Sequence, residues 1–178
     1  EHDSMAFKDM REFLAKLDEM GQLKRVKAPI NAAQGTNELQ TLMRLLAETN
    51  GPGLLLENLE GYNTPDVPVI FNPFGTRERT GLTIGTKDPI EAKVKHTAIL
   101  ADRSTWHKPR MVERKEAPCK NVVIPREKIS IDKQIPHVWL GKEGASYICG
   151  GVVVTKDPET GVRNVGWYRL TSLWNCKH

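Results

Sequence analysis

The chain has 178 residues, of which 39% are hydrophobic and 27% are charged, and its formal net charge at pH 7 is +4. This size fits one domain, or one domain and part of a second, and leaves room for a hydrophobic core. Basic residues are interspersed with acidic ones. A nucleic-acid-binding surface needs clustered positive charge, so the sequence disfavours that function.

No apolar stretch approaches the roughly 18 residues of a membrane span, and the N-terminus lacks the apolar run of a signal peptide. Three cysteines, Cys119, Cys149 and Cys176, form an odd set without CxxC spacing. We therefore expect reduced thiols and a cytoplasmic location. Residues 1–4, "EHDS", are interpreted as the remnant of an expression tag and are excluded from the fold prediction.

The first part of the sequence alternates between helix and strand patterns. Asp9 or Ser4 is the predicted N-cap of the first helix, and Gly21 stands where a C′ glycine belongs. Asp88 followed by Pro89 marks the start of a third helix, as N-cap and N1 residue. In chain order we expect a helix over residues 10–20, a strand within 22–30 ended by Pro29, a helix over 37–49, strands over 54–58 and 67–72, and a helix from residue 88.

The second part changes character. Residues 101–118 show no clear period and are interpreted as a linker. The two last apolar runs flank the turn sequence "KDPETG" and predict a β-hairpin. After the linker we expect strands over residues 122–124, 129–131, 147–155 and 162–170, with no convincing helix among them.

The hairpin carries the most chemically suggestive residues. Strand alternation predicts Asn164, Gly166, Tyr168 and Leu170 on one face and Val165, Trp167 and Arg169 on the other. An arginine beside a tryptophan on a strand is costly to bury unless it meets an anion, which suggests a carboxylate clamp. An edge arginine that pairs with a surface acid remains the alternative.

Other candidates favour structural roles. The glycine-rich turns "NGPG" and "PFGT" match neither GxGxxG nor GxxxxGK[ST]. His96, His107 and His137 are far apart in the sequence and form no metal-binding pair. Cys119 would be a nucleophile only with a paired base, and none can be named.

The sequence "NVGWYR", Asn164 to Arg169, resembles the N-x-G-x-x-R motif of the UbiD family, (de)carboxylases that use prenylated FMN. Other segments resemble the family in the same order, and the similarity spans Met5 to Arg169. These segments are "MREFLAKLDEMGQLKRVKAPI", "GPGLLLENLEGYNTP", "VIFNPFGTRER", "EAPCKNVVI" and "IPHVWLGKEGASYICGGVVVTKDPETG".

The resemblance implies an α+β fold. Family members are far longer and have an N-terminal α/β region, a central split β-barrel related to flavin reductases, and a C-terminal α/β domain. We therefore expect an N-terminal α/β domain over residues 5–117. Residues 118–178 would be the first strands of the split β-barrel that binds the cofactor, truncated within that barrel.

The resemblance also implies site residues. Asn164 matches a ligand of a divalent metal, expected to be manganese, that bridges to the flavin phosphate. Trp167, Tyr168 and Arg169 match positions that line prenylated FMN, and Arg169 matches the catalytic arginine that partners glutamates. Trp167 departs from the commoner isoleucine. Potassium is a further expected ion, and His178 is not assigned because the family's metal-binding histidine lies further downstream.

The implied activity is removal or addition of CO2 on an aromatic or α,β-unsaturated acid, by a homo-oligomer completed by the rest of the chain or a second subunit. We expect the 178-residue chain alone to be inactive. A non-catalytic split-barrel module that assembles with a catalytic chain remains an alternative. A nucleic-acid binder would need basic residues on one face beside exposed aromatics. The substrate and the direction of reaction stay open.

Overall fold

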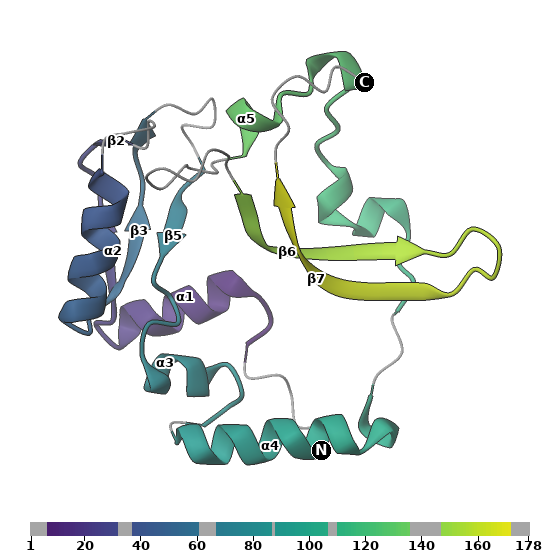
Figure 1. Cartoon of the computed structure of the whole chain (residues 1–178), viewed down its shortest axis with the longest axis horizontal. Helices are drawn as coiled ribbons and strands as arrows, with labels where there is room; N and C mark the ends of the chain where they lie inside the picture. The colour runs from purple at the N-terminus through teal and green to yellow at the C-terminus, as the bar shows by residue number, and fades with distance from the viewer. Residues whose placement is uncertain are drawn as a thin grey trace.

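The computed structural model describes residues 7–31, 37–60, 67–86, 88–106, 110–135 and 147–171, with a mixed α+β arrangement (Figure 1). The α-helices are α1 (Met10–Glu19), α2 (Glu38–Glu48), α3 (Arg77–Leu82), α4 (Pro89–Ala101) and α5 (Ile131–Gln134). The strands are β1 (Leu23–Val26), β2 (Ile30–Asn31), β3 (Gly53–Leu56), β4 (Leu59–Glu60), β5 (Val69–Phe71), β6 (Tyr147–Lys156) and β7 (Arg163–Thr171). Short 3-10 turns are η1 (Arg103–Thr105), η2 (Arg114–Glu116), η3 (Pro118–Lys120) and η4 (Arg126–Lys128).

A three-stranded sheet, in the order β1-β3-β5, forms the centre of the N-terminal part. Strand β3 runs parallel to β1 and antiparallel to β5, and all four of its residues are buried. Leu54 and Leu56 pack against α2, whereas Leu55 packs against α1. Because neighbouring strand residues point to opposite faces, α1 and α2 cover opposite faces of this sheet.

The predicted helix boundaries are largely confirmed, because their signals are local. The Asp9 carboxylate accepts hydrogen bonds from the backbone N–H groups of Arg11 and Glu12 at the start of α1. Gly21 follows the end of α1 with φ of 67°, in the left-handed region that favours glycine. Asp88 caps α4 by accepting from the Ile90 N–H at 2.7 Å.

Three small elements of the N-terminal part were not predicted. Strand β1 ends at Val26, before Pro29, and Ile30 then begins β2, which pairs in parallel with β4. Helix α3 starts after Thr76, whose hydroxyl accepts from the Arg79 N–H. These elements are two to six residues long, too short to show a period in the sequence.

The predicted strands over residues 122–124 and 129–131 are wrong. Residues 121–125 belong to no strand, residues 126–128 form η4, and Ile131 begins α5. Val122 is 79% exposed, and Pro125 next to this run has no N–H to donate to a ladder. β-branched residues favour a strand only where another strand pairs with them, and none does so here within the described residues.

Arg79, on α3, is a buried charged residue beside one end of the central sheet. It is only 1% exposed, and its Nη2 donates to the carbonyl oxygens of Gly51 at 2.9 Å and Asn72 at 3.4 Å. Its Nη1 donates to Oε1 of Gln22 at 3.4 Å. The acceptor residues lie just before β1, before β3 and after β5. One guanidinium therefore connects all three strands at the same end of the sheet.

The charge of Arg79 is matched by carbonyl dipoles. Burial lowers the pKa of the Arg79 guanidinium, while the nearby Glu78 carboxylate raises it. Helix α2 has no basic residue in its last turn, and the Gly51 carbonyl lies just beyond that end. Since the C-terminal end of a helix carries partial negative charge, Arg79 supplies from α3 the cation that α2 lacks.

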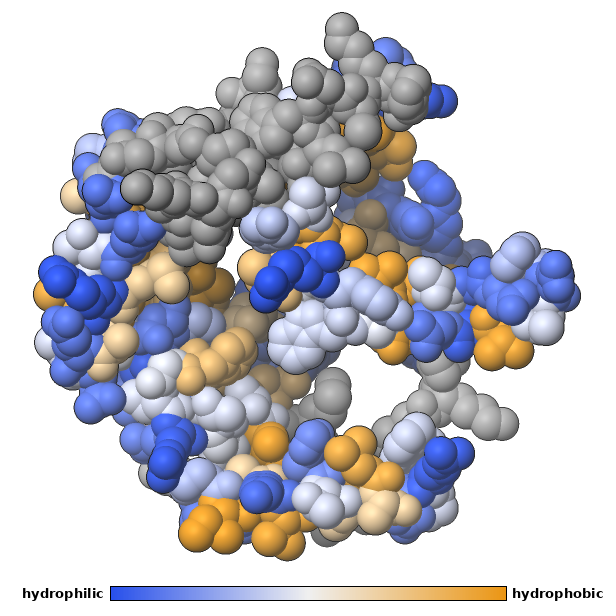
Figure 2. Space-filling view, viewed as in Figure 1, coloured by the Kyte–Doolittle hydropathy of each residue, from blue (hydrophilic) through white to orange (hydrophobic). Residues whose placement is uncertain are grey.

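The hairpin β6–β7 lies apart from the two hydrophobic clusters of the described residues, which come from the N-terminal elements. Val152, Val165 and Trp167 are 66%, 64% and 77% exposed. Figure 2 shows hydrophobic side chains at the surface of the hairpin and of α4. The hairpin is therefore held by its own ladder rather than by a core. The described helices include none long and apolar enough to cross a membrane.

We predict that Arg79→Met lowers the free energy of unfolding by about 2–3 kcal/mol, because it removes the hydrogen bonds that the charged guanidinium donates to Gly51, Asn72 and Gln22. Arg77→Met on the exposed side of the same helix is the matched control and should change it by less than about 0.5 kcal/mol. Urea denaturation of both variants measures the difference. Equal stability of Arg79→Met and wild type would show that relief of charge burial offsets the lost hydrogen bonds.

We predict that the amides of β7 exchange with solvent faster than those of α1 in a dilute solution of this chain. The reason is that β7 has solvent on both faces, whereas α1 buries Phe13 and Leu17. Hydrogen–deuterium exchange read by NMR compares the two elements directly. Equal protection would mean that the hairpin gains stability from contacts beyond its own ladder.

Candidate functional site

The predicted hairpin is confirmed, and its turn is organised by Asp157. The Asp157 carboxylate accepts from the N–H groups of Glu159 at 2.8 Å and Thr160 at 2.9 Å. These hydrogen bonds lower the pKa of Asp157, because they favour its charged form. Gly161 completes the turn with φ of 72°. The turn fixes the register of β6 and β7, and the candidate site residues lie on β7.

The register of β6 and β7 places those residues on two faces. Trp167 lies opposite Val152, and Asn164 lies opposite Thr155. Since alternate residues share a face, Trp167 and Arg169 lie on one face and Asn164 and Tyr168 on the other. This alternation is the predicted one. The hairpin by itself therefore brings together two pairs of candidate residues rather than all four.

A β-bulge in β6 lies opposite the arginine of the motif. The register passes from Ile148 opposite Leu170 to Gly151 opposite Tyr168, so Cys149 and Gly150 together face Arg169. A bulge bends the strand, increases its twist and re-aims side chains. Bulges are frequent next to active sites, and this one adjoins the most chemically suggestive residue of the chain.

On the first face, Trp167 and Arg169 lie against small or aromatic neighbours. A Cβ added to Gly150 would have the Trp167 indole nitrogen as its nearest contact, at 3.7 Å, so the indole lies beside the bulge. The guanidinium carbon of Arg169 lies 5.9 Å from the ring centroid of Tyr147. Ion pairs among the described residues do not involve Arg169, so the alternative of an arginine paired with a surface acid finds no support there.

On the second face, the ring of Tyr168 covers Gly166. A Cβ at residue 166 would lie 2.8 Å from Cζ of Tyr168, too close for the ring to stay in place. The glycine of the "NVGWYR" motif thus makes room for the tyrosine two residues later. Asn164 is exposed on this face, next to Gly166 and opposite Thr155.

Sequence reasoning missed three features of this site: the bulge, the contact of Tyr147 with Arg169, and the reason for Gly166. The two consecutive glycines at 150 and 151 were the available signal for the bulge, because glycine inside a strand pattern often marks one. No local signal indicates Tyr147, because its contact with Arg169 depends on the register.

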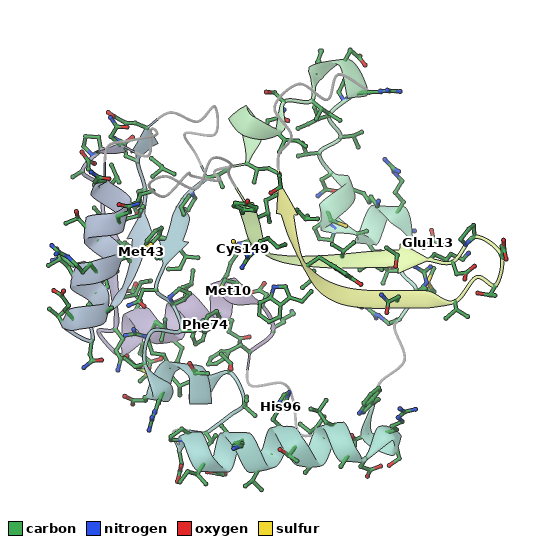
Figure 3. All side chains as sticks on the ribbon, in the orientation of Figure 1. Met10, Met43, Phe74, His96, Glu113 and Cys149 are labelled. Carbon is green, nitrogen blue, oxygen red and sulfur yellow. The ribbon has the colours of Figure 1, made fainter. Side chains whose placement is uncertain are left out.

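Of the remaining candidates that the structure describes, Cys149 adjoins this site and His96 does not. His96 lies on α4, away from the hairpin, while Cys149 lies at the bulge (Figure 3). His107, His137, Cys176 and His178 lie outside the described residues. Cys119 and Cys149 are free and exposed. Within the described ranges no three His, Cys, Asp or Glu side chains gather into a metal-binding group.

Two family models match this sequence. The model of the 3-octaprenyl-4-hydroxybenzoate carboxy-lyase N-terminal domain matches residues 14–95. The model of the Rift-related domain of the same carboxy-lyase matches residues 110–175. Together they take in most of the chain, and the second contains the whole hairpin.

Solved structures of decarboxylases and of a UbiD-class enzyme are also similar to this chain. A vanillic acid decarboxylase from Sedimentibacter hydroxybenzoicus, in open form, is 31% identical with a TM-score of 0.72 over 92% of this chain and 36% of that chain. The UbiD-class enzyme HmfF from Pelotomaculum thermopropionicum, in complex with FMN, is 29% identical with a TM-score of 0.72 over 89% of this chain and 33% of that chain. An evolved dimeric form of HmfF in complex with prFMN is 28% identical, with a TM-score of 0.70 over 89% and 34%. The chain spans about a third of the length of these structures.

We predict that Gly166→Ala displaces the ring of Tyr168, because the new methyl group would occupy the space of that ring. The ring resonances of Tyr168 in a ¹H–¹³C NMR spectrum should move. Gly150→Ala is the matched control in the same hairpin, since its Cβ would have its nearest contact at 3.7 Å. Unchanged Tyr168 resonances in Gly166→Ala would contradict the steric role of this glycine.

Proposed function

The chain belongs to the UbiD family of carboxy-lyases and matches the N-terminal portion of that family, and we propose that it forms part of a decarboxylase or carboxylase that uses prenylated FMN. The proposed substrate class is an aromatic or α,β-unsaturated carboxylic acid, with CO2 as product or co-substrate. The observation that carries the proposal is the position of "NVGWYR" on β7, with Arg169 opposite a bulge. The bound FMN and prFMN of the HmfF structures support the choice of cofactor.

Arg169 is proposed to orient the carboxylate of the substrate. A guanidinium stays charged at any physiological pH and offers N–H groups in a planar fork that matches a carboxylate. Arg169 is exposed and its side chain takes part in no hydrogen bond or ion pair among the described residues, so its donors are available. A cation at this position would hold the acid and place its carboxylate carbon in a constant geometry.

The flavin is proposed to lie along the free edge of β7. Within the described residues β7 pairs only with β6, so its other edge is open. A flat cofactor at this edge can meet side chains from both faces, which accounts for a motif whose residues alternate. Trp167 would approach it from one face and Tyr168 from the other. The bound prenylated FMN would supply the electron sink that loss of CO2 requires.

Asn164 is proposed as one ligand of a divalent metal, with manganese expected. An amide oxygen suits a hard cation such as Mn²⁺ or Mg²⁺, and the hydroxyl of Thr155 is a second oxygen donor on the same face. These groups fit part of a metal site. The other ligands are proposed to come from the flavin phosphate and from residues beyond this sequence. No described residue is assigned to potassium.

The rest of the active site is proposed to come from the remaining part of a longer chain or from a second subunit, within a homo-oligomer. The chain spans about a third of its solved relatives. The family resemblance implies that the glutamates for proton transfer follow later in a longer chain. The hairpin would then be the start of a split β-barrel, which would cover its exposed valines. Both matching models describe carboxy-lyase domains, so a non-catalytic module is not favoured.

The proposal is tested with the protein of natural length, loaded with prenylated FMN and Mn²⁺ and supplied with a panel of aromatic and acrylic acids. Release of CO2 that depends on the prenylated cofactor is the expected result. Binding of FMN without turnover of any acid in the panel, in either direction, would count against it.

We predict that Arg169→Lys in that enzyme lowers kcat/KM by roughly a hundredfold, because lysine keeps the charge but loses the fork that positions the carboxylate. The matched control is Arg163→Lys, on the same strand and the same face but outside the motif, and it should leave kcat/KM nearly unchanged. Steady-state kinetics with thermal melts compare the two variants. Equal activity of Arg169→Lys and wild type would make Arg169 an ordinary surface residue.

A further inference from the structure

Tyr147 is the first residue of β6, and its ring lies beneath the guanidinium of Arg169. The Arg169 Cζ is 5.9 Å from the ring centroid, within the range of a cation–π contact. Tyr147 pairs in register with Thr171, which places it diagonally across from Arg169 on the same face. Tyr147 is half-buried, whereas Arg169 is exposed, so the ring is the more fixed of the two partners.

The bulge is what puts Tyr147 on this face together with Val152. The two residues are five positions apart, and in a regular strand an odd separation sends side chains to opposite faces. The extra residue at Cys149 and Gly150 reverses the alternation. Consequently Tyr147 and Val152 both lie on the side that carries Trp167 and Arg169. The departure from regular pairing thus lets the ring of Tyr147 meet the arginine.

A ring suits this task better than a carboxylate would. An exposed arginine has many rotamers, and fixing it for a reaction costs conformational entropy. A carboxylate partner would restrict the side chain but would also occupy its N–H donors and neutralise its charge. An aromatic face attracts the cation while leaving the N–H groups at the rim of the guanidinium free for another acceptor.

We propose that Tyr147 is a positioning residue for Arg169, which it holds with its ring so that the guanidinium fork is presented to the carboxylate of the substrate. The effect of Tyr147 on activity rests on the proposed function, whereas its contact with Arg169 does not depend on any cofactor. Tyr147 touches neither substrate nor flavin in this role and acts only through Arg169.

The contact is tested by NMR on this chain. The side-chain resonances of Arg169, identified by their loss in Arg169→Lys, should be shifted upfield by the ring current of Tyr147. Tyr147→Leu should return them to ordinary values, whereas Tyr147→Phe keeps the ring and should keep the shift. The side-chain resonances of Arg163, on the same face, should not respond. Arg169 resonances that are identical in wild type and Tyr147→Leu would overturn the proposal.

The consequence is tested by a double-mutant cycle in the enzyme of natural length. Tyr147→Leu should lower kcat/KM for the acid substrate roughly two- to fivefold, the effect of one exposed cation–π contact, and Tyr147→Phe should restore it. In an Arg169→Lys background, Tyr147→Leu should have almost no further effect. An equal loss in both backgrounds would show that Tyr147 acts independently of Arg169 and would overturn its positioning role. A wild-type enzyme without turnover would overturn the proposed function instead, and the NMR comparison would still decide the contact.

Discussion

The arrangement of the N-terminal part depends on the burial of one cation, Arg79. Its guanidinium bonds to groups just before β1, before β3 and after β5, so it joins three strands at the same end of the sheet. The Asn72 side chain adds to this junction by donating to the Gly51 carbonyl at 3.2 Å. A buried charge is costly unless polar groups surround it. Here carbonyl dipoles fulfil that need, while the Nε of Arg79 has no partner among the described residues.

The hairpin follows a different physical rule. Its two strands pair along nearly their whole length, but most of their apolar side chains face solvent. An isolated two-stranded ribbon is marginally stable in water, and both edges of such a ribbon can accept another strand. The central sheet of the N-terminal part is covered by helices on both faces, whereas among the described residues the ladder of the hairpin consists of its own two strands alone. Within the described residues, such an unpaired edge is consistent with similarity to solved structures that are about three times longer than this chain.

The difference between what could and could not be predicted from the sequence follows from the range of each interaction. The caps at Asp9 and Asp88 and the turn at Asp157 depend on residues within a few positions, and sequence patterns revealed all three elements. The run at residues 122–124 has strong strand propensity, but a strand also needs a partner, which a propensity does not contain. The burial of Arg79 could not be predicted from the sequence either, because arginine is seldom buried and its partners are 57, 28 and 7 residues away.

At the site, the alternation of β7 was predictable but its meaning was not. Strand geometry alone separates Trp167 and Arg169 from Asn164 and Tyr168, so a single motif is divided between two faces of the strand. Among the described residues the outer edge of β7 is unpaired, and the flavin proposed to lie there would reach both faces. The neighbouring strand decides how Arg169 is presented, because the bulge in β6 brings Tyr147 to it. The position of Tyr168 depends on β7 itself, where the absence of a side chain at Gly166 makes room for the ring. The arrangement of the motif side chains therefore depends on β6, which carries no motif residue, as well as on the six residues of the motif itself.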